Sequence, residues 1–295
     1  MEKDNNFSVG IVLVNYNGEK YLNQCVNSLL NCDYKNISII IVDNASKDNS
    51  MKRLDEEFND SRIYKIMMDD NYGIATGNNT GIKKSIELKM DFTLLLNNDT
   101  EVEPNFLNEL VSAYEEKCLI VPKMFYYDDK SLLCFGGGRF IKWKASAYHL
   151  FDRQKDTESN NYPTYCNYAP TTCMLIKNDD FKVIGFMDDD YFLYYDDVDF
   201  VYRALKNKYK IKFCPKAVVY HKDGLSTGGK ESVISVYYNS RNKLYFVKKH
   251  KFPFYTKFYA RFGRFLKAHF GPKENRPIIK KAVKDFKKKE MGKMK

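Results

Sequence analysis

Short apolar runs that end abruptly in polar residues recur along the first half of the chain. They cover residues 9–14, 38–42 and 92–96, with a weaker run at 63–68. Each run is followed by a turn and then by a segment whose apolar residues recur every three to four positions, as in a helix. Strands that alternate with helices predict an α/β fold with a mainly parallel central sheet.

The run at residues 92–96 passes directly into Asn97, Asn98 and Asp99. A continuous apolar segment of this length is typical of a strand that is buried on both faces of a parallel sheet. Polar residues just past such strands lie at the edge where open α/β sheets bind ligands. The same residues precede Pro104 and would also suit the start of a helix, so a helix cap is the alternative interpretation.

Two other predicted strands end in the same way, at Asn15 and at Asp43. Because the carboxyl ends of parallel strands share one edge, we expect both residues near Asp99.

Three glycines spaced by four residues follow the weaker run. Gly73, Gly77 and Gly81 permit tight turns and close approach of the backbone to a ligand, so we expect a ligand-binding loop over residues 71–81. A short helix through Leu88 would follow this loop. Close packing of a glycine-bearing helix and an ordinary loop without a ligand are the alternatives.

An acidic cluster follows an aromatic run later in the chain. Asp196, Asp197 and Asp199 come directly after residues 191–195, at the predicted start of a helix. Carboxylates favour the first turn of a helix, and Asp199 could pair with Arg203 four residues on. Carboxylates held beside aromatic side chains can instead act as general bases, and we favour this interpretation.

His221 ends the last predicted strand, at residues 211–220. A single histidine at a strand end is more often packed or exposed than a ligand. Together with Asp99 it would provide a carboxylate and an imidazole, a pair that suits Mn²⁺ or Mg²⁺.

Composition indicates a folded globular protein with room for a large core, since 44% of the 295 residues are hydrophobic and 15% are aromatic. The seven scattered cysteines lack metal-ligand spacing, so reduced and packed thiols are expected. No apolar run approaches the roughly 20 residues that span a bilayer, and the N-terminus lacks a signal-peptide pattern. We therefore expect a cytoplasmic protein.

The positive charge is concentrated at the C-terminus. Residues 248–295 hold 17 Lys or Arg against three acids, a net charge of +14, so the total of +10 leaves −4 for residues 1–247. A basic tail on an acidic body predicts that the tail meets an anionic surface.

Within the tail, residues 258–270 have the pattern of an amphipathic helix. Aromatic and aliphatic side chains fall on one face and basic side chains on the other: Phe258, Tyr259, Phe262, Phe265, Leu266 and Phe270 against Arg261, Arg264 and Lys267. This pattern predicts binding to an anionic membrane interface, at the inner face of the plasma membrane for a cytoplasmic protein. The alternatives are a helix that docks on the body and a solvated tail. Nucleic acid is not expected, because no base-reading motif accompanies the charge.

Taken in order, the motifs over residues 8–245 resemble those of inverting family 2 glycosyltransferases. The most similar subgroup is the rhamnosyltransferase-like enzymes of bacterial surface polysaccharide synthesis. The motifs are Val-Asn-Tyr-Asn-Gly at 14–18, Ile-Val-Asp-Asn-Ala-Ser-Lys-Asp at 41–48, the glycine-rich segment at 71–81, Leu-Leu-Asn-Asn-Asp-Thr-Glu at 95–101, Tyr-Asp-Asp-Val-Asp-Phe at 195–200, and His221.

The resemblance implies a GT-A nucleotide-diphospho-sugar transferase fold over residues 1–245, followed by a basic helical tail at 246–295. It implies direct transfer of a sugar, with rhamnose expected, from a nucleotide-diphosphate donor with inversion at the anomeric carbon. The acceptor would be a hydroxyl of a polysaccharide or lipid-linked glycan.

The resemblance also implies roles for individual residues. Asp99 and His221 would hold a divalent metal, Mn²⁺ or Mg²⁺. Asp197 would be the base, with Asp196 beside it, and Arg203 and Arg241 would be candidates for orienting the carboxylate or contacting phosphate. The glycine-rich loop would close over the donor, and the donor-binding set would be Asn15, Asn17, Asp43, Gly73, Gly77, Asn79, Asn97, Asn98 and Arg241.

One position departs from the family pattern. The first acid of the Asp-x-Asp metal motif is Asn97 in this chain. An amide can bind ribose or a metal-bound water but carries no charge, so weaker metal binding is expected. Asp196, where many relatives have Glu, is a milder change.

Two other functions are compatible with a nucleotide-binding edge. One is a catalytically silent nucleotide-sugar-binding scaffold subunit, and the other is a metal-dependent nucleotidyltransferase. The acidic cluster at 196–199 favours sugar transfer over both.

Overall fold

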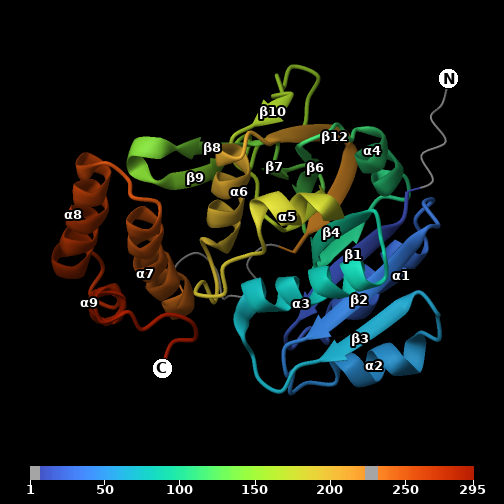
Figure 1. Cartoon of the computed structure of the whole chain (residues 1–295), viewed down its shortest axis with the longest axis horizontal. Helices are drawn as coiled ribbons and strands as arrows, with labels where there is room; N and C mark the ends of the chain where they lie inside the picture. Colours follow the sequence, from blue (N-terminus) through green and yellow to red (C-terminus); the bar gives the residue numbers. More distant parts are fainter. Residues whose placement is uncertain (1–6, 223–231) are drawn as a thin grey trace.

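The computed structural model describes residues 7–222 and 232–295. Its main feature is a ten-stranded sheet in which eight strands follow the order β10-β12-β6-β11-β4-β1-β2-β3, while β5 pairs with β12 and β7 with β6 (Figure 1). The strands of this sheet are β1 Val9–Asn15, β2 Ile37–Asp43, β3 Ile63–Met67, β4 Phe92–Asn97, β5 Thr100–Val102, β6 Cys118–Tyr126, β7 Leu133–Phe135, β10 Tyr165–Cys166, β11 Cys173–Lys177 and β12 Lys210–His221. A separate hairpin pairs β8 Gly138–Ile141 with β9 Ser146–His149.

Helices alternate with the strands in the first half of the chain and dominate its end. They are α1 Leu22–Leu30, α2 Ser50–Glu57, α3 Gly73–Glu87, α4 Phe106–Ser112, α5 Phe181–Ile184, α6 Asp196–Lys206, α7 Val233–Lys249, α8 Phe254–Phe270 and α9 Asn275–Lys288. Short 3₁₀ turns cover Lys142–Lys144 and Asn178–Asp180.

The predicted parallel sheet is present at the centre of the fold. β1 runs parallel to both β2 and β4, and β2 runs parallel to β3. Every residue of β1 and β2 is buried, which explains why their sequences are continuous apolar runs rather than alternating ones. The sheet is mixed beyond this centre, because β11 lies antiparallel between β4 and β6.

The expected loop over residues 71–81 is wrong, because α3 begins at Gly73 and includes the other two glycines. A Cβ atom at Gly77 would stand 2.7 Å from Cγ1 of Val14, and one at Gly81 would overlap the side chain of Val12. Both glycines therefore let α3 lie directly on β1, which is the helix-packing alternative. Gly73, with φ of +86°, adopts the left-handed conformation where the helix starts.

The C-terminal helices form a group at one end of the molecule, away from α1 and α2 (Figure 1). The helix α7 continues through the domain boundary expected between residues 245 and 246, and it packs against α8 and α9. The last residues return to the main body, where Lys293 pairs with Asp70 at 2.8 Å and the backbone N–H of Met294 donates to the Tyr238 hydroxyl at 2.8 Å. The C-terminal region is thus docked on the body.

No helix within the described ranges is both long and apolar enough to cross a membrane. All seven cysteines are buried and lie outside disulfide bonds, which confirms the prediction of packed thiols.

Candidate active site

Polar residues from neighbouring strands meet at one edge of the sheet, as predicted. In the parallel register, Asn15 of β1 lies opposite Asp43 of β2, and Val14 lies opposite Asn97 of β4. The apolar runs therefore end level with one another, and their polar ends share one edge.

Asn15 joins these residues in a buried hydrogen-bond network. Its side-chain N–H group donates to Asp43 at 2.7 Å, and its Oδ1 accepts from Asn98 Nδ2 at 2.8 Å. The second carboxylate oxygen of Asp43 accepts from the backbone N–H of Ser46 at 2.9 Å. Since each member is satisfied, the network fixes the turn that carries Asn98.

A cavity of about 400 Å³, here called the edge cavity, opens beside this network. Four of the predicted site residues line it: Gly73, Asn97, Asn98 and Asp99. Asn15 and Asp43 are not part of its wall. The other lining residues are Val14, Tyr16, Asn44, Asn71, Ile74, Phe192, Leu193, Ile234, Tyr238, Lys293 and Met294.

The structure brings Asp99 and His221 together. β5 pairs antiparallel with the end of β12, with Thr100 opposite His221, and this places His221 Nε2 3.3 Å from Asp99 Oδ1. Both side chains are largely buried. Burial by itself lowers the pKa of His221, but the adjacent Asp99 carboxylate outweighs it and raises this pKa to about 10.

The chemistry of this pair fits a divalent cation, because an oxygen and a nitrogen donor lie close enough to reach one ion. In the described part of the chain, no cluster of three or more His, Cys, Asp or Glu side chains could hold a metal. Two protein ligands leave the remaining coordination positions to water or to a bound anion. The side chain of Asn97 is a neutral amide, so it adds no third charged ligand to this pair.

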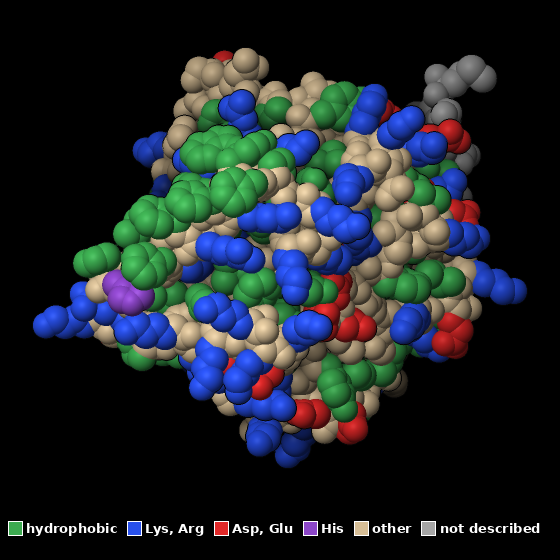
Figure 2. Space-filling view, turned by 60° about the vertical axis from the view of Figure 1, so that its left-hand side comes forward, with side chains coloured by type: hydrophobic (Ala, Val, Ile, Leu, Met, Phe, Trp, Pro, Cys, Tyr) green, Lys and Arg blue, Asp and Glu red, His purple; other side chains and the backbone are tan. Residues whose placement is uncertain are grey.

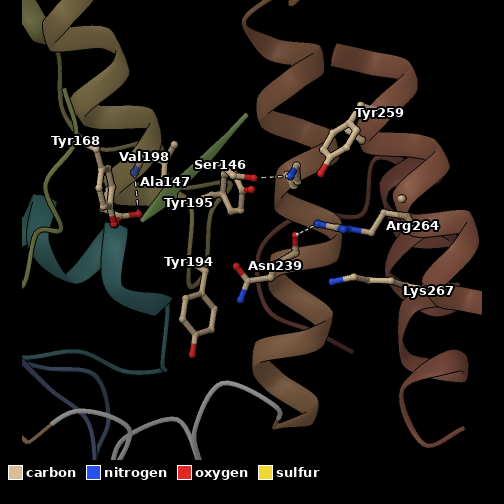
Figure 3. A pocket seen from close by; sticks show the side chains of 14 residues that line it. Ser146, Ala147, Tyr168, Tyr194, Tyr195, Val198, Asn239, Tyr259, Arg264 and Lys267 are labelled. Atoms are coloured by element: carbon tan, nitrogen blue, oxygen red, sulfur yellow. Dashed lines mark hydrogen bonds between the residues drawn. The ribbon is translucent and has the colours of Figure 1, made fainter. Parts of the chain in front are cut away.

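Asp197 lies in a different cavity, of about 460 Å³, between α6, α7 and α8 (Figure 3). We call it the α6–α8 cavity. The hydroxyl of Tyr168 donates to one oxygen of Asp197 at 2.5 Å, and the backbone N–H of Val198 donates to the other at 2.7 Å. Burial raises the pKa of Asp197 even though these hydrogen bonds act to lower it. A carboxylate with a raised pKa is a better proton acceptor.

Asp196 is more deeply buried than its neighbour. Burial, together with the charge of Asp197, raises the pKa of Asp196 well above its usual range. Of the two, Asp197 is the carboxylate that lines a cavity, so it is the one that a ligand can reach.

An unusual backbone turn presents the two carboxylates. Tyr194 and Tyr195 both have positive φ, of 62° and 70°, immediately before α6. The side-chain N–H groups of Asn242 donate to the carbonyls of Leu193 and Tyr194, each at 2.8 Å. Asn242 therefore positions this turn, and no pattern in the sequence marks that role.

Arg203 has contacts other than those expected. Its guanidinium pairs with Asp199 at 2.8 Å and donates to the carbonyls of Ile184 and Phe186. It holds the 184–186 turn to α6 rather than orienting Asp197, so the helix-pairing alternative is correct for Arg203.

Arg241 is also structural. It is fully buried against Tyr237 and Tyr238, and it donates to the carbonyl of Gly292 at 2.7 Å. It anchors the C-terminal segment and does not line the edge cavity.

Three other expected donor-binding residues lie outside the edge cavity. Asn79 donates to the carbonyl of Met187 at 2.8 Å and to Asp189 at 2.7 Å, which ties α3 to the segment before α6. Asn17 accepts from the backbone N–H of Lys47 at 2.8 Å, and Gly77 lies within α3 on the side that faces β1. Each of the three residues makes contacts within the fold rather than in the wall of the edge cavity.

Several residues of the edge cavity were absent from the predicted site. Asn44 directly follows Asp43, and Asn71 lies two residues before Gly73, so the motifs that contain them could have pointed to both. Lys293 and Met294 enter the wall from the far end of the chain. No local sequence signal indicates such a contact.

Comparison with known proteins defines the class. The sequence model of the glycosyl transferase family 2 domain matches residues 10–181, more than half of the chain. The chain therefore belongs to the family 2 glycosyltransferases, and its structural neighbours have the GT-A fold.

Individual relatives lie at low identity. The chain is 24% identical over 238 residues to the low-salt glycan biosynthesis hexosyltransferase Agl10 of Haloferax volcanii, covering 80% of this chain and 74% of that protein. It is 23% identical over 265 residues to the dTDP-rhamnosyl transferase RfbF of Shigella flexneri, covering 84% and 82%. The structure of GalNAc-T7 with UDP, GalNAc and Mn²⁺ is similar with a TM-score of 0.67 and 17% identity, covering 97% of this chain and 56% of that one.

Proposed function

We propose that the protein is an inverting glycosyltransferase that moves a sugar from a nucleotide-diphosphate donor to a hydroxyl of a glycan acceptor. The observation that carries this proposal is the Asp99–His221 pair, 3.3 Å apart beside the edge cavity, in a chain that belongs to glycosyltransferase family 2.

The edge cavity would hold the nucleotide part of the donor. Asn97 and Asn98 line it with neutral amides, and the Asn15–Asp43 network holds Asn98 in place. Asn44 adds a second amide to the same wall. Amides can pair with the polar edges of a base or with ribose hydroxyls, which supports nucleotide binding there.

Asp99 and His221 would hold Mn²⁺ or Mg²⁺. A bound ion would neutralise charge on the departing diphosphate. The similar GalNAc-T7 structure contains UDP and Mn²⁺, which supports this assignment. Position 97 holds a neutral Asn rather than a second carboxylate. We therefore expect the ion to be held weakly until oxygens of the donor diphosphate also coordinate it.

Asp197 would accept the proton of the attacking acceptor hydroxyl. It lines the α6–α8 cavity, its carboxylate is oriented by Tyr168, and burial raises its pKa. These features suit a base that must be ionised before transfer and protonated during it. Attack from this side, opposite to the leaving diphosphate, would invert the anomeric centre.

Rhamnose remains the proposed sugar, because RfbF is named a dTDP-rhamnosyl transferase and aligns over most of both chains. The proposed acceptor is a polysaccharide or lipid-linked glycan.

Association with an anionic membrane is part of this proposal. The helix α8 buries its small residues Thr256, Ala260 and Ala268, whereas its aromatic side chains lie exposed. Figure 2 shows hydrophobic side chains in a row on this face, surrounded by Lys and Arg. The exposed set is Phe254, Tyr255, Phe258, Tyr259, Phe262, Phe265, Leu266 and Phe270. Exposed aromatics beside basic residues are typical of interfacial helices.

Incubation of the protein with a panel of nucleotide sugars and Mn²⁺ tests the proposal. We expect one donor, with dTDP-rhamnose as the first candidate, to release nucleoside diphosphate slowly without acceptor and to stop doing so in EDTA. Tight binding without any release would indicate the scaffold function instead. Release of pyrophosphate from a nucleoside triphosphate and a sugar phosphate would indicate a nucleotidyltransferase.

A further inference from the structure

The α6–α8 cavity contains more positive charge than its one carboxylate can balance. Lys243 of α7 and Arg264 and Lys267 of α8 all line it, and Asp197 is the one acidic residue in its described wall. Among the described residues, none of these three cations forms an ion pair with a carboxylate within 4.0 Å, whereas many other lysines and arginines of the chain do.

Lys243 is the most unusual of the three, because only 6% of its surface is exposed. Its ammonium group donates to the neutral hydroxyl of Ser146 at 2.6 Å. Burial, together with the charges of Arg264 and Lys267, lowers the pKa of Lys243 to about 7. Buried cations are normally paired with an anion, so this group lacks its usual partner.

Arg264 also has a buried hydrogen-bond donor without an acceptor among the described residues. One terminal N–H group donates to the backbone carbonyl of Asn239 at 3.3 Å, while Nε is buried with no acceptor among the described residues. In Figure 3, Arg264 and Lys267 extend from α8 toward Asn239, across the cavity from Tyr168 and Val198. The basic side of the cavity therefore faces the side that carries Asp197.

We infer that this basic wall binds a phosphate group carried by the acceptor, so that the substrate is a phosphorylated sugar or glycan whose reactive hydroxyl meets Asp197. A guanidinium and two ammonium groups match the charge and the several oxygens of a phosphate better than a single carboxylate. The cavity volume of about 460 Å³ accommodates a sugar with its phosphate.

Lys243, Arg264 and Lys267 are not positioned to bind the donor diphosphate or to pair with the Asp197 carboxylate. None of them lines the edge cavity, whose wall includes Asp99. The largest influences on the pKa of Asp197 come from burial, Tyr168, backbone N–H groups and His149, not from these three side chains. Their orientation toward a separate space assigns them to a separate ligand.

The acceptor role of this ligand rests on the proposed sugar transfer, whereas the anion site itself does not. Binding of inorganic phosphate to the full chain in EDTA, followed by ³¹P NMR, tests the site alone. Lys267→Gln, at an exposed residue of the cavity wall, and Lys243→Gln should each weaken phosphate binding at least tenfold. Lys248→Gln, on the same helix as Lys243 but outside the cavity, should leave it unchanged. Absence of phosphate binding, or equal binding by all variants, overturns the inference.

Kinetics then test the acceptor role. With the donor found in the panel, kcat/KM for a sugar phosphate as the acceptor should be at least tenfold higher than kcat/KM for the matching unphosphorylated sugar. Lys267→Gln should remove this preference through KM and leave acceptor-independent donor hydrolysis within twofold. No preference for the phosphate, or an equal loss of donor hydrolysis, contradicts the assignment. Without any donor turnover the proposed function fails, while the phosphate-binding result stands.

A further comparison distinguishes the source of the phosphate. The same sugar is offered as a soluble phosphate ester and as a polyprenyl diphosphate in vesicles. Faster transfer to the vesicle substrate assigns the site to lipid-linked acceptors, and faster transfer to the soluble ester assigns it to soluble sugar phosphates. Both results support the acceptor role of the phosphate subsite. If neither substrate accepts the sugar, the acceptor role is contradicted.

Discussion

Three aspartates within four residues at the start of α6 have three different environments. Burial raises the pKa of Asp196 well above its usual range and raises that of Asp197 less. Burial also acts to raise the pKa of Asp199, but His250, Lys249 and Arg203 outweigh it and lower this pKa to about 2. The same residue type thus provides a deeply buried neighbour with a raised pKa, the proposed proton acceptor and a structural anion.

Asp199→Asn tests the structural assignment of this residue. Asp199 is fully buried and lies 2.8 Å from Arg203 Nε, 2.7 Å from His250 Nε2 and 2.7 Å from Lys249 Nζ. Removing the charge leaves these cations without their anion, and we expect a loss of about 3–5 kcal/mol in the free energy of unfolding. Urea denaturation measures this loss, with exposed Asp179→Asn as the control. A loss similar to that of the control would refute the assignment.

The same carboxylate predicts a pH dependence. Because the folded pKa of Asp199 is depressed to about 2, its stabilising contribution is present above about pH 4, the ordinary Asp pKa, and is lost as the pH falls through about 2. The difference in unfolding free energy between the natural protein and Asp199→Asn should therefore shrink between pH 5 and pH 2.5. A difference that is constant over this range would show that the charge is not responsible.

At the residue scale, sequence patterns located the carboxylates but could not separate all their roles. The spacing of Asp199 and Arg203 allowed the ion pair, yet Lys249 and His250 reach Asp199 from about 50 residues away along the chain. The pairing of Asp99 with His221 likewise depends on the contact between β5 and β12. Such contacts follow from tertiary packing, which local patterns do not encode.

At the scale of elements, the continuous apolar runs predicted strands correctly, whereas the glycine spacing predicted a loop where the structure has a helix. The runs became β1, β2 and β4, with polar residues at one edge. The glycine-rich segment became α3, because contact with β1 compensates for the low helix propensity of glycine. The antiparallel insertion of β11 was not predictable, since strand pairing over long distances leaves no local pattern.

The packing of α3 on β1 predicts the effect of adding one methyl group. Gly81→Ala would place a Cβ against Val12, so we expect a loss of about 1–3 kcal/mol in unfolding free energy. Combining it with Val12→Ala should make the total loss smaller than the sum of the two single losses, because the smaller side chain leaves room. Denaturation of the four proteins measures this coupling. Strictly additive losses would show that Gly81 does not contact Val12.

The exposed face of α8 predicts binding to anionic vesicles. Changing Phe258, Phe262 and Phe265 together to Ser removes side chains that are 47–56% exposed, so stability should change much less than for buried phenylalanines. We expect binding to phosphatidylserine-containing vesicles to weaken at least tenfold, measured by co-sedimentation. Val183→Ser, an exposed apolar residue on α5, is the control. Unchanged sedimentation of the triple variant would place the membrane contact elsewhere or exclude it.

At the scale of the whole molecule, the C-terminal region belongs to the folded structure. Tyr237 of α7 donates to Asp285 of α9 at 2.7 Å, and Arg241 holds the carbonyl of Gly292. Deletion of residues 248–295 would therefore expose buried parts of α7 as well as remove charge. Point substitutions on α8 are the better test of its surface.

One short segment, residues 192–197, lies between the edge cavity and the α6–α8 cavity. Phe192 and Leu193 line the edge cavity, whereas Tyr194, Tyr195 and Asp197 line the α6–α8 cavity. In the proposed enzyme, the donor and the acceptor would occupy opposite sides of this segment. The proposed base would then lie on the acceptor side, where the basic wall would hold the acceptor phosphate.

Asp197→Asn tests the central claim most directly. The substitution keeps the size and the planar shape of the side chain but removes its ability to accept a proton. With the donor identified in the panel, we predict that transfer to the acceptor falls by about 10²–10⁴-fold while the dissociation constant for the donor stays within twofold. Near-normal transfer by Asp197→Asn, with donor binding intact, would contradict the account.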